Sequence, residues 1–150
     1  MDNPHVAKLV RRLSLLLDTN VLSDLRRRNA GNEQLFRWRD ATQAEFKFIS
    51  TISVIEIEFG VLRAESKNMP HAPALRSWIT RLLDEFTGAI IGVDIDIALA
   101  TARLQRIRTV PFNDAIIAAT ALVHDLAVVT RNERDFSGLG VKIINPWSPT

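Results

Sequence analysis

The amino-acid sequence predicts an α/β fold, a three-layer sandwich in which a mostly parallel sheet of four to five strands is covered by helices on both faces. Short apolar runs alternate along the chain with segments that repeat their apolar residues at helical spacing. Apolar strands of this kind are typical of parallel sheets that are buried on both sides. The 150 residues, 47% hydrophobic and 24% charged, are enough for the core of one ordinary domain.

The first strand is expected at 13–17 (LSLLL), because this apolar run is short and ends abruptly in the polar residues DTN. The elements expected to follow it in the first half of the chain are helices at 20–28 and 33–43, a strand at 47–51 and a helix at 53–65. Ser53 is a plausible N-cap for the last of these helices.

The second half is expected to continue the alternation, with a helix at 75–86, a strand at 89–93, helices at 95–108 and 113–125, and strands at 127–130 and 141–144. Either Asp94 or Asp96 is expected to cap the helix at 95–108. The segment 75–86 is strongly amphipathic. Its apolar stripe has two explanations, ordinary core packing or an exposed surface that forms a homodimer together with the first helices.

Composition excludes several classes of protein. The chain has no cysteine, which rules out a disulfide scaffold, a thiolate zinc site and a cysteine nucleophile. The apolar run at 13–17 is too short for a signal peptide, and no stretch approaches the roughly 18 apolar residues that span a membrane. We therefore expect a cytoplasmic protein.

Positive charge is concentrated in arginine clusters although the formal net charge is only +2. The clusters lie at 11–12, 26–28, 103–108 and 131–134. Arginine suits phosphate binding because its planar guanidinium donates hydrogen bonds in pairs. Solvated helix faces explain the same clusters, so charge alone does not choose.

Acidic residues fall where a parallel sheet places its ligands, beyond the carboxyl ends of the strands. Asp18 directly follows the first strand, although it is equally well explained as the N-cap of the next helix. Glu56 lies in an otherwise apolar segment, but Ser53-x-x-Glu56 also matches a capping box. Asp114 is the acid on the first turns of the helix at 113–125, where the helix dipole is its alternative explanation.

A fourth polar group follows the strand at 127–130. Asn132 and Asp135 are its candidates for a functional role, and both could instead shape the loop through Asx turns. Three separate segments nevertheless place an acid at the same sheet edge. Carboxylates held that close repel one another until protonation or a cation relieves them. Oxygen ligands suit Mg²⁺ or Mn²⁺, and the histidines are not spaced for zinc.

Four stretches together resemble the PIN-domain toxins of bacterial toxin–antitoxin pairs, the family commonly called VapC. They are LLLDTNVLSDL at 15–25, ISVIEIEFG at 52–60, PFNDAIIAATALVHDLAVVTRNERDF at 111–136 and VKIINP at 141–146, and they occur in the order typical of the family. The resemblance implies a PIN domain over 13–147, with an N-terminal tail at 1–12 and a C-terminal tail at 148–150. It also implies an α/β sandwich, homodimerisation and a partner antitoxin.

The resemblance assigns the acids to a metal site. Asp18 matches the first metal ligand, and Glu56 rather than Glu58 matches the second acid because it stands four residues before Gly60. Asp114 matches the third. The fourth acid of the wider PIN pattern falls at Asn132, so this ligand position is open between Asn132 and Asp135, of which Asp135 is the acid.

The expected function is that of an endoribonuclease toxin that uses Mg²⁺, or Mn²⁺, held by Asp18, Glu56, Asp114 and Asp135 to activate a water against RNA phosphodiesters. Polar neighbours are predicted to contact the substrate or to orient the acids, namely Thr19, Asn20, Ser53, Thr130, Arg131 and Asn132. The alternative is a PIN-domain module that binds RNA but has lost catalysis, for which Asn132 would be the mark.

Two other enzyme classes fit less well. A haloacid-dehalogenase-like phosphatase also has an Asp after its first strand, but it needs a second Asp two residues later, where Asn20 stands. A dinucleotide-binding domain needs a glycine-rich turn after that strand, and Asp18-Thr19-Asn20 has none.

Overall fold

The computed structural model describes residues 13–148, so the predicted tail at 1–12 and the last two residues of the tail at 148–150 lie outside the described part. The elements are, in order, β1 (Ser14–Leu17), α2 (Thr19–Leu25), η1 (Ala30–Asn32), α3 (Glu33–Ala41), β2 (Phe46–Ser50), α4 (Thr51–Ser66), α5 (Ala72–Glu85), β3 (Ile90–Ile91), α6 (Ile95–Ile107), α7 (Phe112–His124), β4 (Ala127–Val129), α8 (Glu133–Phe136) and β5 (Lys142–Ile144).

The five strands form one sheet in the order β3-β2-β1-β4-β5, and every neighbouring pair is parallel. β1 lies at the centre, where it pairs with β2 on one side and β4 on the other. Helical crossovers between parallel strands leave all the carboxyl ends at one edge. The predicted fold class is confirmed, and Asp18 follows the central strand as expected.

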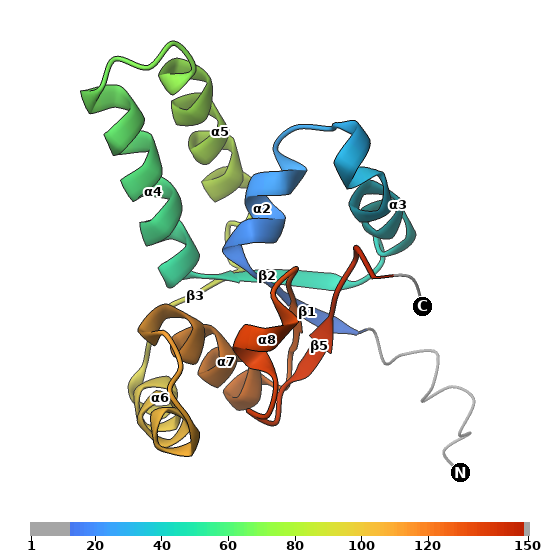
Figure 1. The fold of residues 1–150 in the computed structure, drawn as a ribbon, viewed down its shortest axis with the longest axis vertical. Coiled ribbons are helices and arrows are strands. Elements are labelled where there is room, and N and C mark those ends of the chain that lie inside the picture. Colours follow the sequence, from blue (N-terminus) through green and yellow to red (C-terminus); the bar gives the residue numbers. More distant parts are fainter. Residues whose placement is uncertain (1–12, 149–150) are drawn as a thin grey trace.

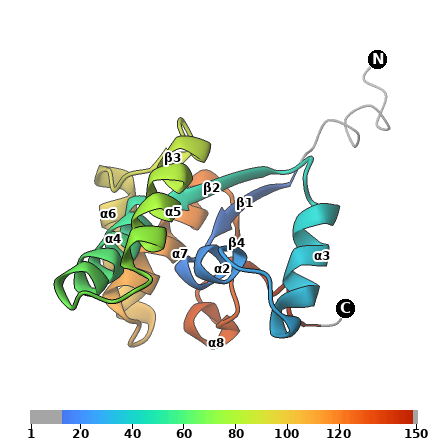
Figure 2. The same ribbon diagram turned by 90° about the horizontal axis from the view of Figure 1, so that it is seen from above.

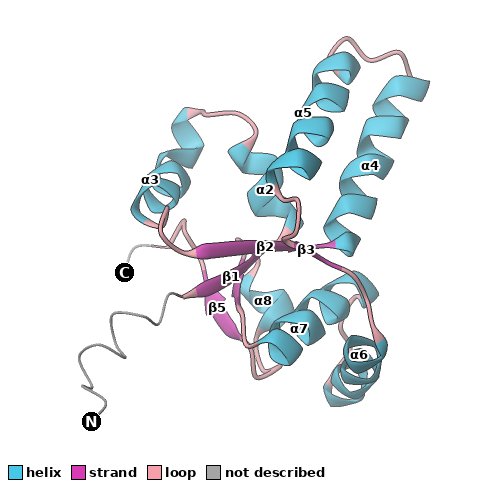
Figure 3. Cartoon of the chain, turned by 180° about the vertical axis from the view of Figure 1, so that it is seen from behind, coloured by secondary structure: helices cyan, strands magenta, loops and turns pink. Residues whose placement is uncertain are grey.

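Helices cover both faces of the sheet and make three layers (Figures 1 and 3). One layer contains α2, α3, α4 and α5, and the other contains α6, α7 and α8. Side chains alternate across β1, because Leu15 and Leu17 pack with the first layer and Leu16 packs with the second. The sheet therefore separates two hydrophobic cores. A site at the edge of the sheet can contain residues from the helices of both layers.

The amphipathic helix α5 packs beside α4, and the two form a hairpin that extends beyond the sheet (Figures 1 and 2). Most of its apolar stripe belongs to the first core, where Ile79 and Leu82 are buried and Leu75, Trp78 and Phe86 are half-buried. Core packing is therefore the right explanation for most of this stripe. Only Leu83 of the stripe is exposed, and the homodimer surface on this helix stays a prediction.

Several element boundaries differ from the prediction for identifiable reasons. α2 ends at Leu25 rather than 28, because the following arginines offer no apolar side chain to bury. α5 begins at Ala72, since Pro73 is tolerated in a first helical turn, where its missing N–H has no helical partner. The strand predicted at 89–93 is reduced to β3, and the short helix α8 replaces a predicted loop.

Between residues 13 and 148, no helix is both long and apolar enough to cross a membrane.

Candidate active site

Asp18 lies at the carboxyl end of β1 and begins α2. Its backbone N–H extends the strand ladder by donating to Val129 O at 2.9 Å, while its side chain caps α2 by accepting from the Thr19 amide at 2.8 Å. Only 6% of Asp18 is exposed. The capping explanation is therefore correct, and it places the carboxylate at the sheet edge at the same time.

The second oxygen of Asp18 is held by residues from two other positions. Thr130, which is fully buried after β4, donates its hydroxyl to Asp18 Oδ2 at 2.8 Å, and Asn20 Nδ2 donates to the same oxygen at 3.2 Å. The backbone N–H of Asn132 in turn donates to Thr130 Oγ1 at 3.0 Å. Both oxygens of Asp18 are thus fixed in direction by donors that the fold supplies.

Glu56 projects from the second turn of α4 toward the start of α2. The predicted capping box is wrong, because α4 begins two residues earlier than expected and Ser50 is its N-cap, accepting from Ile52 N at 3.0 Å. Thr19 Oγ1 instead lies 3.0 Å from Glu56 Oε1 and 2.8 Å from the hydroxyl of the buried Ser53. Glu56 therefore takes no part in capping α4, and its carboxylate is hydrogen-bonded to Thr19, the residue next to Asp18.

Asp114 approaches the same edge from the first turn of α7. Partial burial is the main cause that raises the pKa of its carboxyl to about 6, and the charges of Asp135, Asp18 and Glu56 raise it further while Arg108 opposes the shift. No side-chain hydrogen bond to Asp114 occurs within the described residues. These effects place Asp114 within electrostatic reach of the other three predicted acids.

Burial and neighbouring acids also raise the pKa of Asp18 and of Glu56. For Asp18, desolvation is the largest cause, hydrogen bonds from Thr130 and Thr19 oppose it, and Asp135 adds to it. For Glu56, desolvation again leads, Thr19 opposes it, and Asp18 adds to it. Three carboxylates whose charged forms are all disfavoured make a site that a cation would stabilise.

The donor chemistry fits a hard divalent cation, although a coordination shell is not preformed. Carboxylate oxygens are the ligands that Mg²⁺ and Mn²⁺ prefer. Among residues 13–148, no three His, Asp or Glu side chains are arranged closely enough to ligate one ion. The fit therefore rests on the type of donor and on the mutual repulsion of the acids.

The two candidates for the fourth position are placed differently. Asp135 lies on α8, and its charge raises the pKa of both Asp18 and Asp114. Asn132 precedes α8 with an exposed side chain, and only its backbone joins the network, donating to Thr130 Oγ1 and accepting from the Asp135 amide. The arrangement brings Asp135, rather than Asn132, to the acids.

The predicted RNA-binding arginine next to this loop is already engaged. Arg131 forms an ion pair with Asp24 at 3.7 Å and stacks over the ring of Trp147 at 5.0 Å from its centroid. Its neighbour Arg134 is exposed and lines the hollow over residues 131–135. Arg134 is therefore the freer of the two cations.

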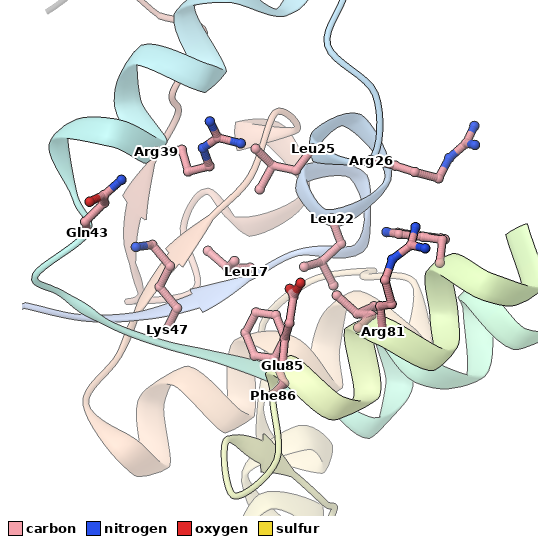
Figure 4. Close-up of a pocket in the computed structure, with 12 residues that line it drawn as sticks. Leu17, Leu22, Leu25, Arg26, Arg39, Gln43, Lys47, Arg81, Glu85 and Phe86 are labelled. Atoms are coloured by element: carbon pink, nitrogen blue, oxygen red, sulfur yellow. The ribbon is translucent and has the colours of Figure 1, made fainter. Parts of the chain in front are cut away.

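A groove leads away from the acids along α2. A hollow of about 380 Å³ is lined by Thr19, Glu56, Gly60, Arg26 and Trp78, among others. Arg26 and Trp78 also line a second hollow, of about 440 Å³, so the two hollows adjoin at these side chains. Figure 4 shows Leu17, Leu22 and Leu25 in the middle of the second hollow, with the cations Arg26, Arg39, Lys47 and Arg81 around them.

Two contributions to the site were missed by sequence reasoning. Ser50 caps α4, but the pattern Ser53-x-x-Glu56 imitates a capping box and drew the helix start to Ser53. Arg108 faces α8 and Asp114, but its position in a run of arginines gave no sign of this. Arg108 differs from the exposed arginines near it only because the end of α6 contacts α8, which is distant in sequence.

A parallel sheet with acids gathered at its carboxyl edge is the arrangement of a PIN domain. The family model described as "PIN domain" matches residues 15–142, so the chain belongs to the PIN-domain family. Within that family it is similar to toxins of the VapC and FitB type, which confirms the resemblance predicted from the four stretches.

Three comparisons support this placement. The chain is 33% identical to Toxin FitB of Neisseria gonorrhoeae, with 89% of this chain and 98% of that protein covered. It is 31% identical to VapC ribonuclease Y4jK of Sinorhizobium fredii, with 90% and 99% covered. A solved structure of FitAB bound to an IR36 DNA fragment superposes with a TM-score of 0.79 at 29% identity, covering 91% of this chain and 97% of that one.

Proposed function

We propose that this chain is the Mg²⁺-dependent endoribonuclease toxin of a toxin–antitoxin pair, with Asp18, Glu56, Asp114 and Asp135 as its metal-binding acids. The observation that carries the proposal is the gathering of acids from distant segments at one sheet edge, where the Thr19 hydroxyl links Glu56 to the residue after Asp18 and the charges of Asp18, Glu56 and Asp135 act on Asp114. A relative named as a VapC ribonuclease supports RNA as the substrate.

In this proposal the chain orients its acids, and the cation would act as a Lewis acid. When bound, Mg²⁺ would lower the pKa of a water and neutralise charge on the phosphoryl oxygens. Thr130 and the Thr19 amide fix the two oxygens of Asp18, and the Thr19 hydroxyl fixes Glu56. Arg134, exposed beside the acids, would bind the RNA backbone, which supplies most of the affinity for nucleic acid.

The test is cleavage of a single-stranded RNA by the purified chain in Mg²⁺. Asp18→Asn should abolish cleavage and keep the fold, as judged by circular dichroism. Glu58→Gln is the matched control, because Glu58 is on the same helix as Glu56 but pairs with Arg76 at 2.8 Å, outside the acid network. Unchanged cleavage by Asp18→Asn would overturn the proposal.

The proposed protein partner is an antitoxin whose segment lies in the groove near the acids. A solved relative is a FitAB complex, which supports a two-protein assembly. The groove offers an apolar floor at Leu17, Leu22 and Leu25 and leads to Thr19 and Glu56. A basic side chain of the antitoxin would compete there with the metal for the acids.

The proposed homodimer would use α4, whereas the sequence predicted the first helices and the segment 75–86. Ile55, Phe59 and Leu62 lie on one face of α4 and are 61%, 66% and 52% exposed. An exposed apolar stripe of this kind is typical of a protein interface. Phe59→Asp should convert the dimer to a monomer in sedimentation equilibrium at micromolar concentration, and a parent chain that is monomeric there would remove the dimer.

A catalytically impaired RNA-binding module is the second candidate, since Asn132 stands at the position of the family's fourth acid and the coordination shell is not preformed in the described residues. Mn²⁺ titration separates the two candidates. The nuclease should bind Mn²⁺ and cleave with it, whereas the impaired module should bind RNA without cleaving it.

A further inference from the structure

Arg108 ends α6, and its side chain lies against α8. Its guanidinium donates four hydrogen bonds, and every acceptor is a backbone carbonyl. Nε donates to Ser137 O at 3.1 Å, and Nη2 donates to Arg134 O at 3.0 Å and to Asp135 O at 2.9 Å. Nη1 donates to Thr109 O at 3.3 Å. Among the arginines of residues 13–148, Arg108 alone combines hydrogen bonds to several separate carbonyls.

Three of these carbonyls belong to the last turn of α8 or directly follow it. The final carbonyls of any helix lack partners within the helix, and a helix as short as α8 (Glu133–Phe136) has almost no internal bonds to hold it. The side chain of Phe136, fully buried in the second core, fixes one side of this turn. Arg108 satisfies the carbonyls and fixes the turn against the end of α6.

The same arginine connects two of the acids. It lies six residues before Asp114 in sequence, at the start of the extended segment that leads into α7, and its charge acts on Asp114. Asp135 is carried by the turn whose carbonyls Arg108 binds. The guanidinium of Arg108 thus links the segment that leads to Asp114 with the helix that carries Asp135.

We propose that Arg108 is a positioning residue that holds Asp135 toward Asp114 and Asp18, so that the four acids can share one divalent cation. This inference rests on the proposed metal site. Four of the five N–H groups of the guanidinium donate to carbonyls, so Arg108 is not the cation that binds the RNA backbone. A lysine would keep the charge but could not span the same carbonyls, because its three N–H donors sit on one compact ammonium group.

The test measures Mn²⁺ affinity of the full chain by isothermal titration calorimetry in four variants. Arg108→Lys should weaken Mn²⁺ binding about tenfold, the usual effect of losing a residue that orients metal ligands. Asp135→Asn should weaken it by a similar or larger factor. Arg108→Lys added to Asp135→Asn should cause little further loss, because Arg108 acts through Asp135. Arg106→Lys is the matched control on the same helix, exposed and without a contact to α8.

Hydrogen exchange gives a readout that needs no metal. The amides of Asp135 and Ser137, which donate to Asn132 O and Glu133 O, should exchange faster in Arg108→Lys while the amides of α7 keep the parental rate. Parental Mn²⁺ affinity in Arg108→Lys, or losses that multiply in the double variant, would overturn the role of Arg108. Failure of the parent chain itself to bind Mn²⁺ would instead overturn the proposed function and the metal site with it.

Discussion

Asp18 and Asp114 face the same sheet edge, but the chain surrounds their carboxylates differently. Asp18 is buried and accepts hydrogen bonds from the Thr19 amide, the Thr130 hydroxyl and the Asn20 amide group. Asp114 accepts none from any residue of 13–148, and burial together with three neighbouring acids raises its pKa to about 6. Hydrogen bonds from the fold orient the carboxylate of Asp18, whereas the carboxylate of Asp114 has no such donors and is repelled by the neighbouring acids.

This difference indicates which side of the site a bound cation would stabilise. The β1 side of the site is organised before any ion binds, because neutral donors hold Asp18 and offset part of the cost of burying its charge. The α7 side lacks such donors, so its compensation must come from a proton or a cation. We expect substitutions on the first side to cost stability and substitutions on the second side to cost metal binding.

The largest effect on stability is expected for Thr130→Val. The change keeps the shape of the side chain but removes the hydroxyl that donates to Asp18 Oδ2 inside the fold. This oxygen then keeps only the longer bond from Asn20. Losing a hydrogen bond to a buried charged group costs about 2 kcal/mol, which lowers the Tm of a domain of this size by about 4–8 °C. Urea unfolding at pH 7.5 measures the loss.

Thr120→Val is the control for that change. Thr120 is also buried, but its hydroxyl donates only to Ile116 O in its own helix. This carbonyl keeps its helical partner, so the expected loss is smaller. Equal losses in the two variants would show that the fold does not depend on the compensation of Asp18.

The next effect is stabilisation by the metal. Mn²⁺ at ten times its dissociation constant should stabilise the parent chain by about 1.4 kcal/mol, because it binds the folded state alone. Asp114→Asn should lose most of this gain, since it removes the acid that depends on the cation. Thermal unfolding with and without Mn²⁺ gives both values, and equal stabilisation of the two chains would contradict the comparison.

A smaller effect is expected for Asp114→Asn without metal, and its sign is opposite. The carboxyl of Asp114 has a pKa of about 6 in the fold and 3.8 in the unfolded chain, so the folded state loses stability as pH rises through this interval. The full shift corresponds to about 3 kcal/mol, and solvent screening at this half-buried site reduces it to about 1 kcal/mol.

Asp114→Asn should therefore be more stable than the parent chain above pH 6 and equal to it near pH 4. Urea unfolding at both pH values tests the sign. A variant that is less stable than the parent at pH 8 would show that Asp114 has a stabilising partner.

The smallest effect is expected for Thr19→Val. Its hydroxyl lies against Ser53 and Glu56 at a partly exposed position, so its loss should cost about 0.5 kcal/mol. Glu56 would lose its orientation while Asp18 keeps its cap, because the Thr19 amide remains. Cleavage should therefore fall more than stability does, and a fall in stability alone would place Glu56 outside the site.

Patterns that extend over several residues, such as apolar runs, were predictable from the sequence. Features that depend on a single residue were not. Apolar runs located all five strands, and the acid after β1 located the carboxyl edge. The start of α4 was misplaced because Ser50 and Ser53 are both good caps and only packing chooses between them. α8 was missed because a four-residue helix has no periodicity of its own and depends on the burial of its Phe136 and on hydrogen bonds from Arg108.

The separation of the molecule into two cores by the sheet has a consequence during synthesis. Asp18 and Glu56 belong to elements made early, whereas Asp114 and Asp135 belong to the layer formed by the C-terminal part of the chain. A nascent chain on the ribosome therefore holds only half of the acids until α7 and α8 have emerged. The site cannot assemble before that point, and chains truncated before α7 lack the α7 and α8 acids.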